Sequence, residues 1–572
     1  MKKLIAYDIE VFLHDALVVF KDLNKNPIIF FHNDFEGILD LIKDYTLIGY
    51  NNYSYDDYIL TKMIAGWSPE QIKMLNDKII KGQEFEKHLD SHIDSIDCFQ
   101  QIDISLPSLK KIEGNMGKKI FESNISFDID RRLTADEFME VLKYCSYDVD
   151  TTIDIYKHRE HSYFESKNKL LEMYGNEKAK RWNTTTISAN ILLNKPLPKW
   201  SSVRVDEELL ELVPPDVRDM WMQANSIGTN IKKKYINMER FNNEIQFGFG
   251  GLHGTHKSKK RFEDIKLLDV SSMYPSIIIN MNALGTSTKK YEDMMKKRLE
   301  IKHKDKTLSD ALKLVLNSVY GNLKNEYSLL NNPKAAISVC IYGQIALYEL
   351  CSRLSAIGEI ININTDGVAF ITDDKRYKEI WKDWEKEFNL TLEEENYGLF
   401  IQKDVNNYIA VKDVKLKGEY GKIILKDNMK VKGADVGRYF SDKLFSNNNA
   451  RIIDIAIVDY LVNKTDVLDT LLYHIDEPKL FQYILKAGGT YLGTFDEDGK
   501  KYNNVNRVFA SKKKDYVLLQ KKRHDGGLVR FADVPEKMFL WNDDLDKLKD
   551  FSEIVDLNHY YQIINKKLER WR

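Results

Sequence analysis

The chain has 572 residues, a mass of 66.9 kDa and 43% hydrophobic residues, so it can bury large cores and is neither wholly disordered nor fibrous. Its 85 basic and 87 acidic residues give a formal net charge of −2, which excludes a uniformly basic nucleic-acid coat but allows a local basic groove. The 4 cysteines form no C-x-x-C pair, and no apolar run reaches ~18 residues. These features predict a cytoplasmic protein with no membrane contact.

Two acids mark the first candidate site. The segment LIAYDIEVF (4–12) predicts a buried strand, and because side chains alternate along a strand, Asp8 and Glu10 point to the same face. Two carboxylates on one apolar face repel each other unless a cation or a proton offsets their charge, and carboxylate oxygens suit Mg²⁺ or Mn²⁺. For this pair alone, a half-exposed edge strand with two solvated acids is the alternative interpretation.

Two further segments carry acids at informative spacings. GYNNYSYDDYIL (49–60) has the pattern N-x-x-aromatic-Asp, which in isolation is also typical of a polar turn. The apolar spacing over 135–160 predicts a helix on which a Tyr-x-x-x-Asp pair shares one face, and in isolation this is an ordinary amphipathic helix. The residues concerned are Asn52, Tyr55, Asp56, Tyr144 and Asp148.

The middle of the chain holds three more patterned segments. LLDVSSMYPSII (267–278) predicts a strand that ends near Asp269 and is followed by a proline turn. KLVLNSVYGNL (313–323) places a lysine, an asparagine and a tyrosine on one helix face, and the lysine offers a compact positive charge suited to a triphosphate. IININTDGVAFI (360–371) predicts a strand, a turn that carries Asp366, and a second strand.

In their order and spacing, the three N-terminal segments resemble the motifs of the DnaQ-like 3′→5′ proofreading exonuclease of family B DNA polymerases. The resemblance implies metal ligands at Asp8, Glu10, Asp56 and Asp148, with Tyr144 orienting the attacking water and Asn52 contacting a frayed single-stranded end. SLKKI (108–112) resembles the single-strand contact motif of the protein-primed branch through Ser108 and Leu109, while SLPSL (105–109) offers a competing register.

The middle segments resemble motifs A, B and C of the same family. By this resemblance Asp269, Asp366 and the Val270 carbonyl hold the catalytic metal ions, and the Tyr274 ring lies under the sugar and blocks a 2′-hydroxyl. The residues implied in nucleotide binding are Tyr274, Arg298, Lys302, Lys313, Asn317 and Tyr320. For Arg298 and Lys302, a solvated basic helix face is the alternative.

Departures from the family pattern fall mainly on DNA contacts. Asn364 replaces the first aspartate of motif C, which removes one negative charge near the metals and keeps Asp366. Gly250 and Gly251 resemble the aromatic-x-Gly-Gly loop, and Tyr408 remains from the primer-binding motif K-x-Y. The other replaced positions are Gly248, Cys340, Gln344, Gly367 and Asn406. The basic runs that are candidates for compensating phosphate contacts are 257–261, 512–514 and 521–523.

The resemblance implies an α/β protein, with an RNase H-like (DnaQ-type) exonuclease followed by a right-hand polymerase. The predicted domains are an exonuclease at 1–185, a linker and the start of the palm at 186–250, palm at 251–290 and 331–425, fingers at 291–330, and a thumb with a C-terminal extension at 426–572. The 44 positions from Asp269 to Lys313 and the 23 from Tyr320 to Gly343 are too few for the two insertions of the protein-primed phage enzymes, which the chain otherwise resembles. We therefore expect short fingers, a nucleic-acid primer and poor strand displacement.

The function predicted from this resemblance is template-directed DNA synthesis from deoxynucleoside triphosphates with 3′→5′ proofreading, for a small bacteriophage replicating in the cytoplasm of a bacterial host. The resemblance implies Mg²⁺ or Mn²⁺, two ions per active site. It also implies a monomer that acts on primed DNA, with a clamp, a helicase or a single-strand-binding protein as partner. Two alternatives stay open: a nuclease whose polymerase half is only a nucleic-acid-binding platform, and a primase-like enzyme that starts chains unaided.

Overall fold

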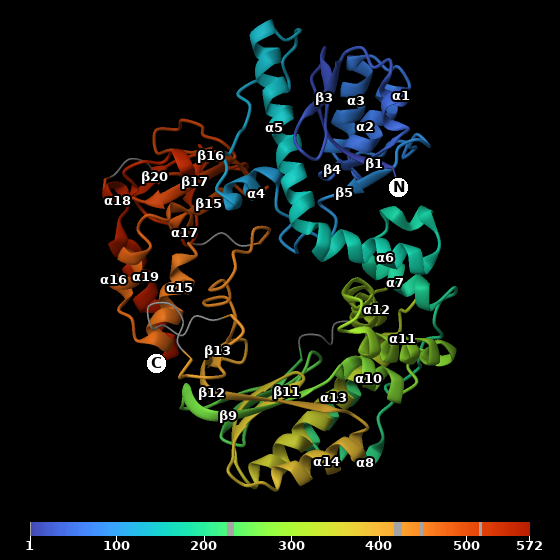
Figure 1. Ribbon diagram of the computed structural model, residues 1–572, viewed down its shortest axis with the longest axis vertical. Helices are drawn as coiled ribbons and strands as arrows, with labels where there is room; N and C mark the ends of the chain where they lie inside the picture. Colours follow the sequence, from blue (N-terminus) through green and yellow to red (C-terminus); the bar gives the residue numbers. More distant parts are fainter. Residues whose placement is uncertain (1, 226–233, 417–425, 447–449, 514–516) are drawn as a thin grey trace. The chain divides into compact units, whose positions relative to one another are not determined.

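The computed structural model describes residues 2–225, 234–416, 426–446, 450–513 and 517–572. The protein is a mixed α/β structure, and its internal contacts divide the chain into two compact units (Figure 1). Unit 1 contains Met1–Glu165, Asp442–Ile452 and Leu471–Tyr560, and unit 2 contains Ser166–Ser441, Ile453–Thr470 and Tyr561–Arg572. The sequence predicts 426–572 as one block, whereas the structure divides this range between the two units.

The N-terminal part of unit 1 is a five-stranded sheet with helices on both faces. Its elements are β1 (Lys3–Val11), β2 (Ala16–Lys21), β3 (Pro27–His32), α1 (Ile38–Ile42), β4 (Tyr45–Gly49), α2 (Asp56–Ile64), α3 (Pro69–Ile80), β5 (Ser95–Asp97), α4 (Leu109–Met116) and α5 (Ala135–Arg159). The strand order is β3-β2-β1-β4-β5, with β1 antiparallel to β2 and parallel to β4. Alternate residues of β1 enter two cores, because Tyr7 and Ile9 pack with α2 and α3 while Ala6 packs with α5.

Local sequence signals set the start of α5, which confirms the helix predicted over 135–160. The Thr134 hydroxyl accepts a hydrogen bond from the Glu137 backbone N–H, and the Glu137 carboxylate accepts one from the Thr134 N–H at 2.8 Å. This capping box satisfies backbone donors that the first helical turn would leave unpaired. Because α5 runs uninterrupted from there, residues one turn apart, such as Tyr144 and Asp148, lie on one face.

The C-terminal part of unit 1 contains two small sheets. Their strands have the orders β15-β17-β20 and β16-β18-β19. The elements are α17 (Pro478–Phe481), β15 (Tyr483–Lys486), β16 (Tyr491–Phe495), β17 (Val505–Ala510), β18 (Leu519–Lys522), β19 (Leu528–Arg530), β20 (Met538–Leu540), α18 (Phe551–Ile554) and, reaching into unit 2, α19 (Leu557–Leu568). Both β15 and β17 contact α4.

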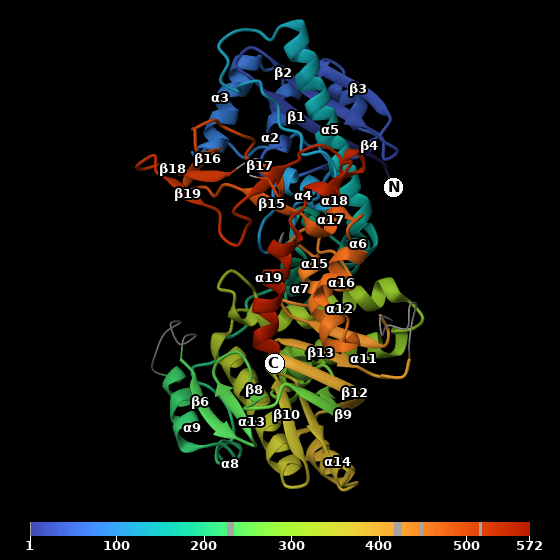
Figure 2. The same ribbon diagram turned by 90° about the vertical axis from the view of Figure 1, so that its left-hand side faces the viewer.

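Unit 2 is built on a nine-stranded sheet with the order β14-β13-β12-β9-β11-β10-β8-β7-β6, part of which is visible in Figure 2. Its strands are β6 (Ile236–Arg240), β7 (Asn243–Phe247), β8 (His253–His256), β9 (Arg261–Val270), β10 (Glu359–Asn364), β11 (Gly367–Ile371), β12 (Leu392–Asp404), β13 (Asn407–Val411) and β14 (Met429–Lys432). The helices α13 (Pro333–Ser355) and α14 (Tyr377–Phe388) cover one face of this sheet. The length and apolarity of α13 would suit a membrane span, but 78% of its most apolar window is buried, as in the core helix of a globular domain.

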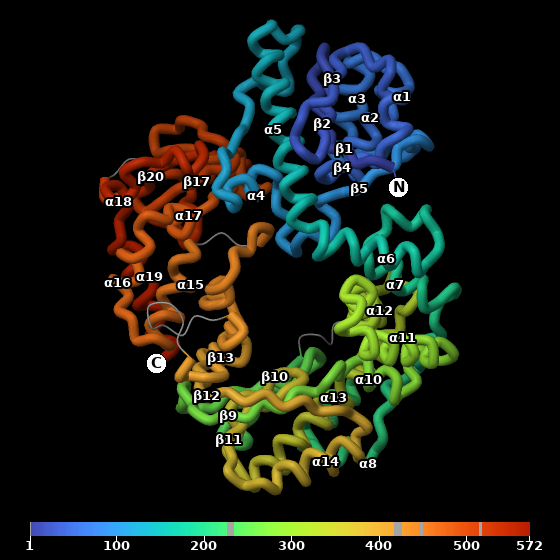
Figure 3. The backbone as a smooth tube through the Cα atoms, in the orientation of Figure 1, coloured from blue at the N-terminus to red at the C-terminus, as the bar shows by residue number. Residues whose placement is uncertain are grey.

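A group of helices completes unit 2, and Figure 3 shows α7, α11 and α12 as neighbours. The helices are α6 (Glu165–Tyr174), α7 (Thr184–Leu192), α8 (Glu207–Leu210), α9 (Pro215–Met222), α10 (Met273–Asn280), α11 (Thr288–Ile301), α12 (Lys306–Lys324) and α15 (Ile452–Val458), with α16 (Val467–Tyr473) at the boundary with unit 1. α11 and α12 pack together as a short helical hairpin, which is consistent with the short fingers expected from the sequence.

Candidate active sites

Four acids converge on one pocket in unit 1. Asp8 and Glu10 lie on β1, Asp56 begins α2, and Asp148 lies on α5. All four line a pocket of about 370 Å³. The structure therefore brings together the four residues that the three N-terminal motifs predict as one group.

Burial and mutual repulsion dominate the electrostatics of this pocket. Burial raises the pKa of Asp8, Glu10 and Asp56 well above their ordinary values, and the charge of a neighbouring acid raises each pKa further. Burial also raises the pKa of Asp148, although the charge of Lys110 lowers it. Four carboxylates cannot all stay ionised in such a site without a cation.

The donor set fits a hard divalent cation. Ligand atoms of Asp8, Glu10 and Cys145 lie within 4.8 Å of one another. The Cys145 thiol is buried, which raises its pKa, and it donates a hydrogen bond to the Asp8 carbonyl oxygen at 3.4 Å. It therefore remains a protonated thiol, and the carboxylate oxygens are the ligands that suit Mg²⁺ or Mn²⁺.

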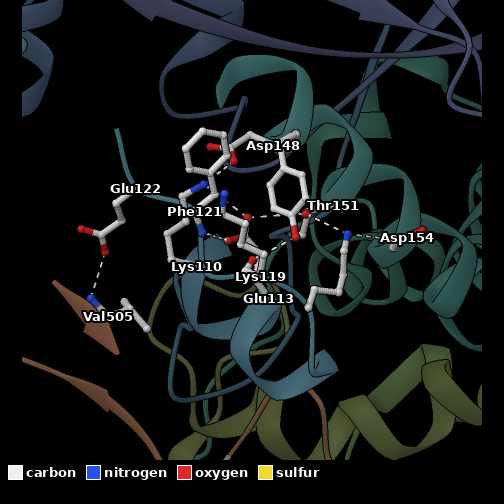
Figure 4. A network of polar contacts seen from close by, with 11 residues as sticks. Lys110, Glu113, Lys119, Phe121, Glu122, Asp148, Thr151, Asp154 and Val505 are labelled. Atoms are coloured by element: carbon white, nitrogen blue, oxygen red, sulfur yellow. Dashed lines mark hydrogen bonds and ion pairs between the residues drawn. The ribbon is translucent and has the colours of Figure 1, made fainter. Parts of the chain in front are cut away.

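Lys110 on α4 connects the pocket to a polar network beside it (Figure 4). Its ammonium pairs with Asp148 and lies 3.2 Å from a Glu113 carboxylate oxygen. Burial opposes the charge on Lys110, but Asp148 and Glu113 outweigh it and raise the lysine pKa. The same ammonium lies 4.3 Å from the centre of the Tyr144 ring, and the Tyr144 hydroxyl lowers the pKa of Asp148 by hydrogen bonding. Lys110 and Tyr144 thus both act directly on a predicted metal ligand.

The loop after β4 places two asparagines differently. Asn51 lines the pocket, whereas Asn52 is fully buried and donates its side-chain N–H to Asp57 at 3.1 Å. The Asp97 carboxylate holds this loop by accepting hydrogen bonds from the backbone N–H groups of Asn51 and Phe99, both at 2.8 Å, and burial raises the pKa of Asp97 to about 6. The predicted contact of Asn52 with a single-stranded end stays a prediction.

The structure separates the two registers proposed for the Ser-Leu motif. Ser108 and Leu109 line the pocket, whereas the Ser105 hydroxyl donates to the Phe445 carbonyl oxygen at 3.4 Å. The Ser108 hydroxyl oxygen is buried and has no hydrogen-bond partner among the described residues. The geometry therefore favours the register 108–112, which places an unpaired polar atom beside the pocket.

A second pair of acids lies on the central strands of unit 2. Asp269 is the penultimate residue of β9, and Asp366 lies in the tight turn between β10 and β11, as the sequence predicts. The Val270 backbone N–H donates to the Asp366 carbonyl oxygen at 2.7 Å, and Gly367 pairs directly with Asp269 across the two strands. The sheet register thus brings two acids that are 97 positions apart to one point.

The electrostatics of this pair also favour a bound cation. Burial and, to a smaller extent, the charge of Asp366 together raise the pKa of Asp269 to about 6. Burial raises the pKa of Asp366 as well, while the charges of Lys432 and Lys430 on β14 lower it. Asp269 is half-buried and Asp366 is exposed, and two neighbouring carboxylates have the ligand chemistry of Mg²⁺ or Mn²⁺.

The replaced residues near this pair have identifiable structural roles. The Asn364 side-chain N–H donates to the Val405 carbonyl oxygen at 3.2 Å. A Cβ atom at Gly367 would lie 2.7 Å from a carboxylate oxygen of Asp269, so any larger residue at 367 would displace that carboxylate. At Gly251, a Cβ atom would lie 3.0 Å from the Thr365 hydroxyl oxygen, so this glycine allows the loop to lie close to the turn that carries Asp366.

Two tyrosines stack beside the acids of unit 2. The rings of Tyr274 on α10 and Tyr320 on α12 have centroids 4.2 Å apart and planes 4° apart. The Tyr274 hydroxyl donates to the Gly250 carbonyl oxygen at 2.9 Å. Stacking on one side and this hydrogen bond at the tip hold the Tyr274 ring in one orientation.

The remaining residues predicted to bind a nucleotide lie on the hairpin of α11 and α12. Lys313 and Asn317 are exposed on α12, and Lys302 is exposed where α11 ends. The Arg298 side chain is half-buried, and its Nε has no hydrogen-bond partner among the described residues. No contact in the structure tests their role with a nucleotide, which stays a prediction.

Residues at or near the positions that depart from the family's DNA-contact motifs make contacts within the protein. Gln344 forms two hydrogen bonds with the backbone of Gly248, at 2.9 and 3.2 Å. The Lys432 ammonium lies 5.8 Å from the centre of the Tyr408 ring, in a register where the two residues pair across β13 and β14. Of the basic runs, 257–261 is engaged in ion pairs and hydrogen bonds within the protein, and Lys514 lies outside the described residues.

The raised pKa of Asp269 predicts a pH-dependent stability that a cation should reverse. A carboxyl with a raised pKa in the folded state contributes stability below its unfolded pKa, and this contribution is lost as the pH rises through about 6. In a chelating buffer, we therefore expect wild-type protein to lose stability relative to Asp269→Asn between about pH 4 and about pH 7. At neutral pH, Mg²⁺ should raise the melting temperature of the wild type more than that of the variant. Equal responses of the two proteins to pH and Mg²⁺ would argue against a cation at Asp269.

No family model matches this sequence, and no curated protein matches it. Among solved structures, the chain is similar to the family B DNA polymerase of the hyperthermophilic archaeon Pyrobaculum calidifontis, with 12% sequence identity and a TM-score of 0.45. The match covers 100% of this chain and 78% of that one. The function proposed below is therefore based on the residues of the two acidic sites.

Sequence reasoning missed several residues at these sites. Lys110 stands inside SLKKI, but nothing in that pattern shows that its ammonium pairs with Asp148. Lys486, at the end of β15, lines the pocket of unit 1 although it is far from the other lining residues in sequence. Lys430 and Lys432 act on Asp366 from a strand that carries no recognised motif. The alternation of lysines in MKVK was the one available signal, since it places both on one face of a strand.

Proposed function

We propose that the protein is a DNA polymerase with a 3′→5′ proofreading exonuclease, the exonuclease in unit 1 and the palm and fingers in unit 2. The observation that supports this proposal is the presence of two separate clusters of carboxylates whose pKa values are raised by desolvation and, at Asp8, Glu10 and Asp269, also by the charge of a neighbouring acid. Each cluster includes acids on an interior strand of its own sheet, which are Asp8 and Glu10 on β1 and Asp269 on β9. Two-metal sites of this kind serve phosphoryl transfer.

In the proposed exonuclease, divalent ions held by Asp8, Glu10, Asp56 and Asp148 supply Lewis acidity at the scissile phosphate. Tyr144 contributes a hydroxyl beside Asp148 and orients the attacking water. Lys110 holds Asp148 in place, and its ammonium lowers the pKa of that carboxyl against the larger, opposing effect of burial. The apolar side chains that line the pocket offer a surface to the terminal base; these are Tyr50, Phe99, Leu106 and Leu109.

In the proposed polymerase, Asp269, Asp366 and the Val270 carbonyl hold the divalent ions. The stacked Tyr274 and Tyr320 rings form a platform under the incoming nucleotide, and the α11–α12 hairpin presents basic side chains to its triphosphate. The primer end would meet Tyr408 and the neighbouring Lys432, which supplies a positive charge that Asn406 does not. Asn364 leaves the Asp269 and Asp366 pair intact, which supports an active polymerase.

Primer extension tests the proposal directly. A labelled primer on a defined DNA template, with Mg²⁺ and four deoxynucleoside triphosphates, should be extended, and the same primer with a mismatched end should be trimmed before extension. The second candidate function, a nuclease with a nucleic-acid-binding platform, predicts trimming without any extension. The raised pKa of Asp269 favours the first candidate, because a platform has no need for two repelling acids.

Tyr274 is expected to exclude ribonucleotides. Because the ring is held by Tyr320 and by Gly250, replacing it with alanine opens space where a 2′-hydroxyl would lie. Incorporation of ribonucleotides by Tyr274→Ala should rise by about tenfold or more relative to deoxynucleotides, which corresponds to about 1.4 kcal/mol of discrimination. Tyr274→Phe keeps the ring and serves as the matched control, with selectivity close to wild type. Unchanged selectivity in Tyr274→Ala would refute this role.

We further propose a small bacteriophage-type enzyme that works as a monomer in the bacterial cytoplasm and extends a nucleic-acid primer. The short α11–α12 hairpin and the direct run from α12 to α13 support an enzyme without the two insertions of the protein-primed branch. Such an enzyme displaces a downstream strand poorly and depends on a clamp, a helicase or a single-strand-binding protein. Rolling-circle product many template lengths long, made by this protein alone, would contradict that dependence.

A further inference from the structure

The C-terminal strands of unit 1 are fixed to α4, the helix that carries Lys110. The fully buried Arg507 on β17 donates hydrogen bonds to the carbonyl oxygens of Gly114 at 3.2 Å and Lys118 at 2.6 Å. A Cβ atom at Gly114 would lie 2.8 Å from the Ile484 side chain, so α4 and β15 are in close contact. The guanidinium satisfies carbonyls at the end of α4, so hydrogen bonds and side-chain packing join the helix to the strands.

A second connection fixes the end of β15. Glu122 accepts hydrogen bonds from the backbone N–H groups of Asn504 at 2.8 Å and Val505 at 2.9 Å, and Figure 4 shows the contact with Val505. Val505 begins β17 and pairs with Lys486, the last residue of β15. The position of Lys486 is therefore set by the strand register and by Glu122, and not by a free loop.

Lys486 projects to the acidic pocket from this fixed strand. It is the one basic residue among the described residues that line the pocket, and its side chain is exposed. The buried Ser108 hydroxyl, which has no hydrogen-bond partner among the described residues, lines the same pocket. Lys111 on α4 is close enough that the charge of Lys486 lowers its pKa, after the larger effect of burial. Two lysine charges and an unpaired hydroxyl beside the pocket suit an anion.

We propose that Lys486 binds a backbone phosphate of the single-stranded 3′ end that enters the exonuclease pocket, beside the strand contact that the Ser-Leu motif predicts for Ser108, so that the C-terminal strands are part of the nuclease. The proposal rests on the proposed nuclease function. Lys110 is the lysine whose charge acts on Asp8, Glu10 and Asp148, so the Lys486 contact belongs to a phosphate away from the scissile one. Lys486 is accordingly a positioning residue that holds the strand.

A contact of this kind changes binding and leaves the chemical step alone. Removing it should raise KM without lowering kcat, because the interaction is equal in the ground state and the transition state. Each phosphate contact to a single strand also adds about 0.7 to the slope of log affinity against log salt concentration. Loss of one contact should therefore reduce that slope by about 0.7.

The experiment measures degradation of a labelled oligothymidylate by the full-length protein with Mg²⁺ at several KCl concentrations. For Lys486→Ala, we expect KM to rise about fivefold at low salt, with kcat unchanged and the salt slope reduced by about 0.7. Lys486→Arg keeps the charge and should stay within about twofold of wild type. Lys537→Ala, an exposed lysine of the same unit outside the pocket lining, is the matched control and should behave as wild type.

The possible results separate this inference from the function on which it rests. Wild-type KM and salt slope in Lys486→Ala would overturn the inference while leaving the nuclease intact. An equal change in Lys537→Ala would also overturn it, because the effect would then come from general surface charge. A fall in kcat at constant KM would contradict a contact away from the scissile phosphate. If wild-type protein does not degrade the oligonucleotide at all, the proposed nuclease fails and this inference fails with it.

Discussion

Replacing Asp269 with alanine is expected to reduce nucleotide addition by about a thousandfold or more, while degradation of 3′ ends continues at the wild-type rate. Metal-assisted phosphoryl transfer depends on several kcal/mol of charge stabilisation, and each 1.36 kcal/mol lost slows the reaction about tenfold. The sheet register gives Asp269 one acidic partner in the neighbouring turn, Asp366, and Asp366→Ala should have the same effect. Primer extension under single-turnover conditions measures both variants.

Stability provides the internal control for this experiment. The Asp269 carboxylate is repelled by Asp366 and partly desolvated, so its removal should not lower the melting temperature. Glu263→Ala, an exposed acid on the same strand β9, should leave both activities unchanged. Extension by Asp269→Ala above about a tenth of the wild-type rate would mean that the acid pair of unit 2 does not hold the catalytic metals.

The second large effect is expected from the double variant Asp8→Ala with Glu10→Ala. Trimming of a mismatched or single-stranded 3′ end should fall by about a thousandfold, because two ligands of the proposed metal centre are lost together. Synthesis should remain close to wild type, because Asp8 and Asp269 lie in different compact units and share no partner among the described residues. If the double variant trims a mismatched primer at the wild-type rate, the nuclease assignment is wrong.

Two adjacent aspartates give a sharper contrast within the same site. Asp56 lines the pocket, whereas Asp57 is fully buried and accepts hydrogen bonds from the Ser95 hydroxyl at 2.7 Å and from the Asn52 side chain. Asp56→Asn should therefore abolish trimming and keep the melting temperature. Asp57→Asn should instead lower the melting temperature, because it disturbs a buried hydrogen-bond network. The opposite pattern would mean that the pocket is not the reaction site.

The local sequence pattern was sufficient to predict which strand, helix or turn carries each of these acids. Alternation along β1 placed Asp8 and Glu10 on one face, the helical spacing of α5 paired Tyr144 with Asp148, and the turn at Asp366 followed from two apolar runs around a short polar segment. These features depend on neighbours within a few residues, which is the range over which periodicity carries information.

Contacts between distant segments were not accessible in the same way. Lys110 reaches Asp148 across 38 positions, and Lys486 belongs to a strand predicted as part of a separate thumb. At the loop after β4, backbone geometry decides which asparagine lines the pocket, since Asn51 has a φ of 63° and lines it while Asn52 is fully buried. A positive φ of this kind leaves only a weak trace in sequence, because asparagine is common in many turns.

The chain crosses from one unit to the other five times, and this has a consequence for biosynthesis. The first segment of unit 1 ends at Glu165, but its last segment ends at Tyr560. At about 5–20 residues per second, a ribosome needs on the order of 20 to 80 s to deliver the intervening chain. Until then α4 lacks Arg507, which satisfies its terminal carbonyls, and Ile120 lacks its partners Ile484 and Val505. The nascent N-terminal part therefore emerges with an uncovered apolar surface, and its folding cannot finish before translation is almost complete.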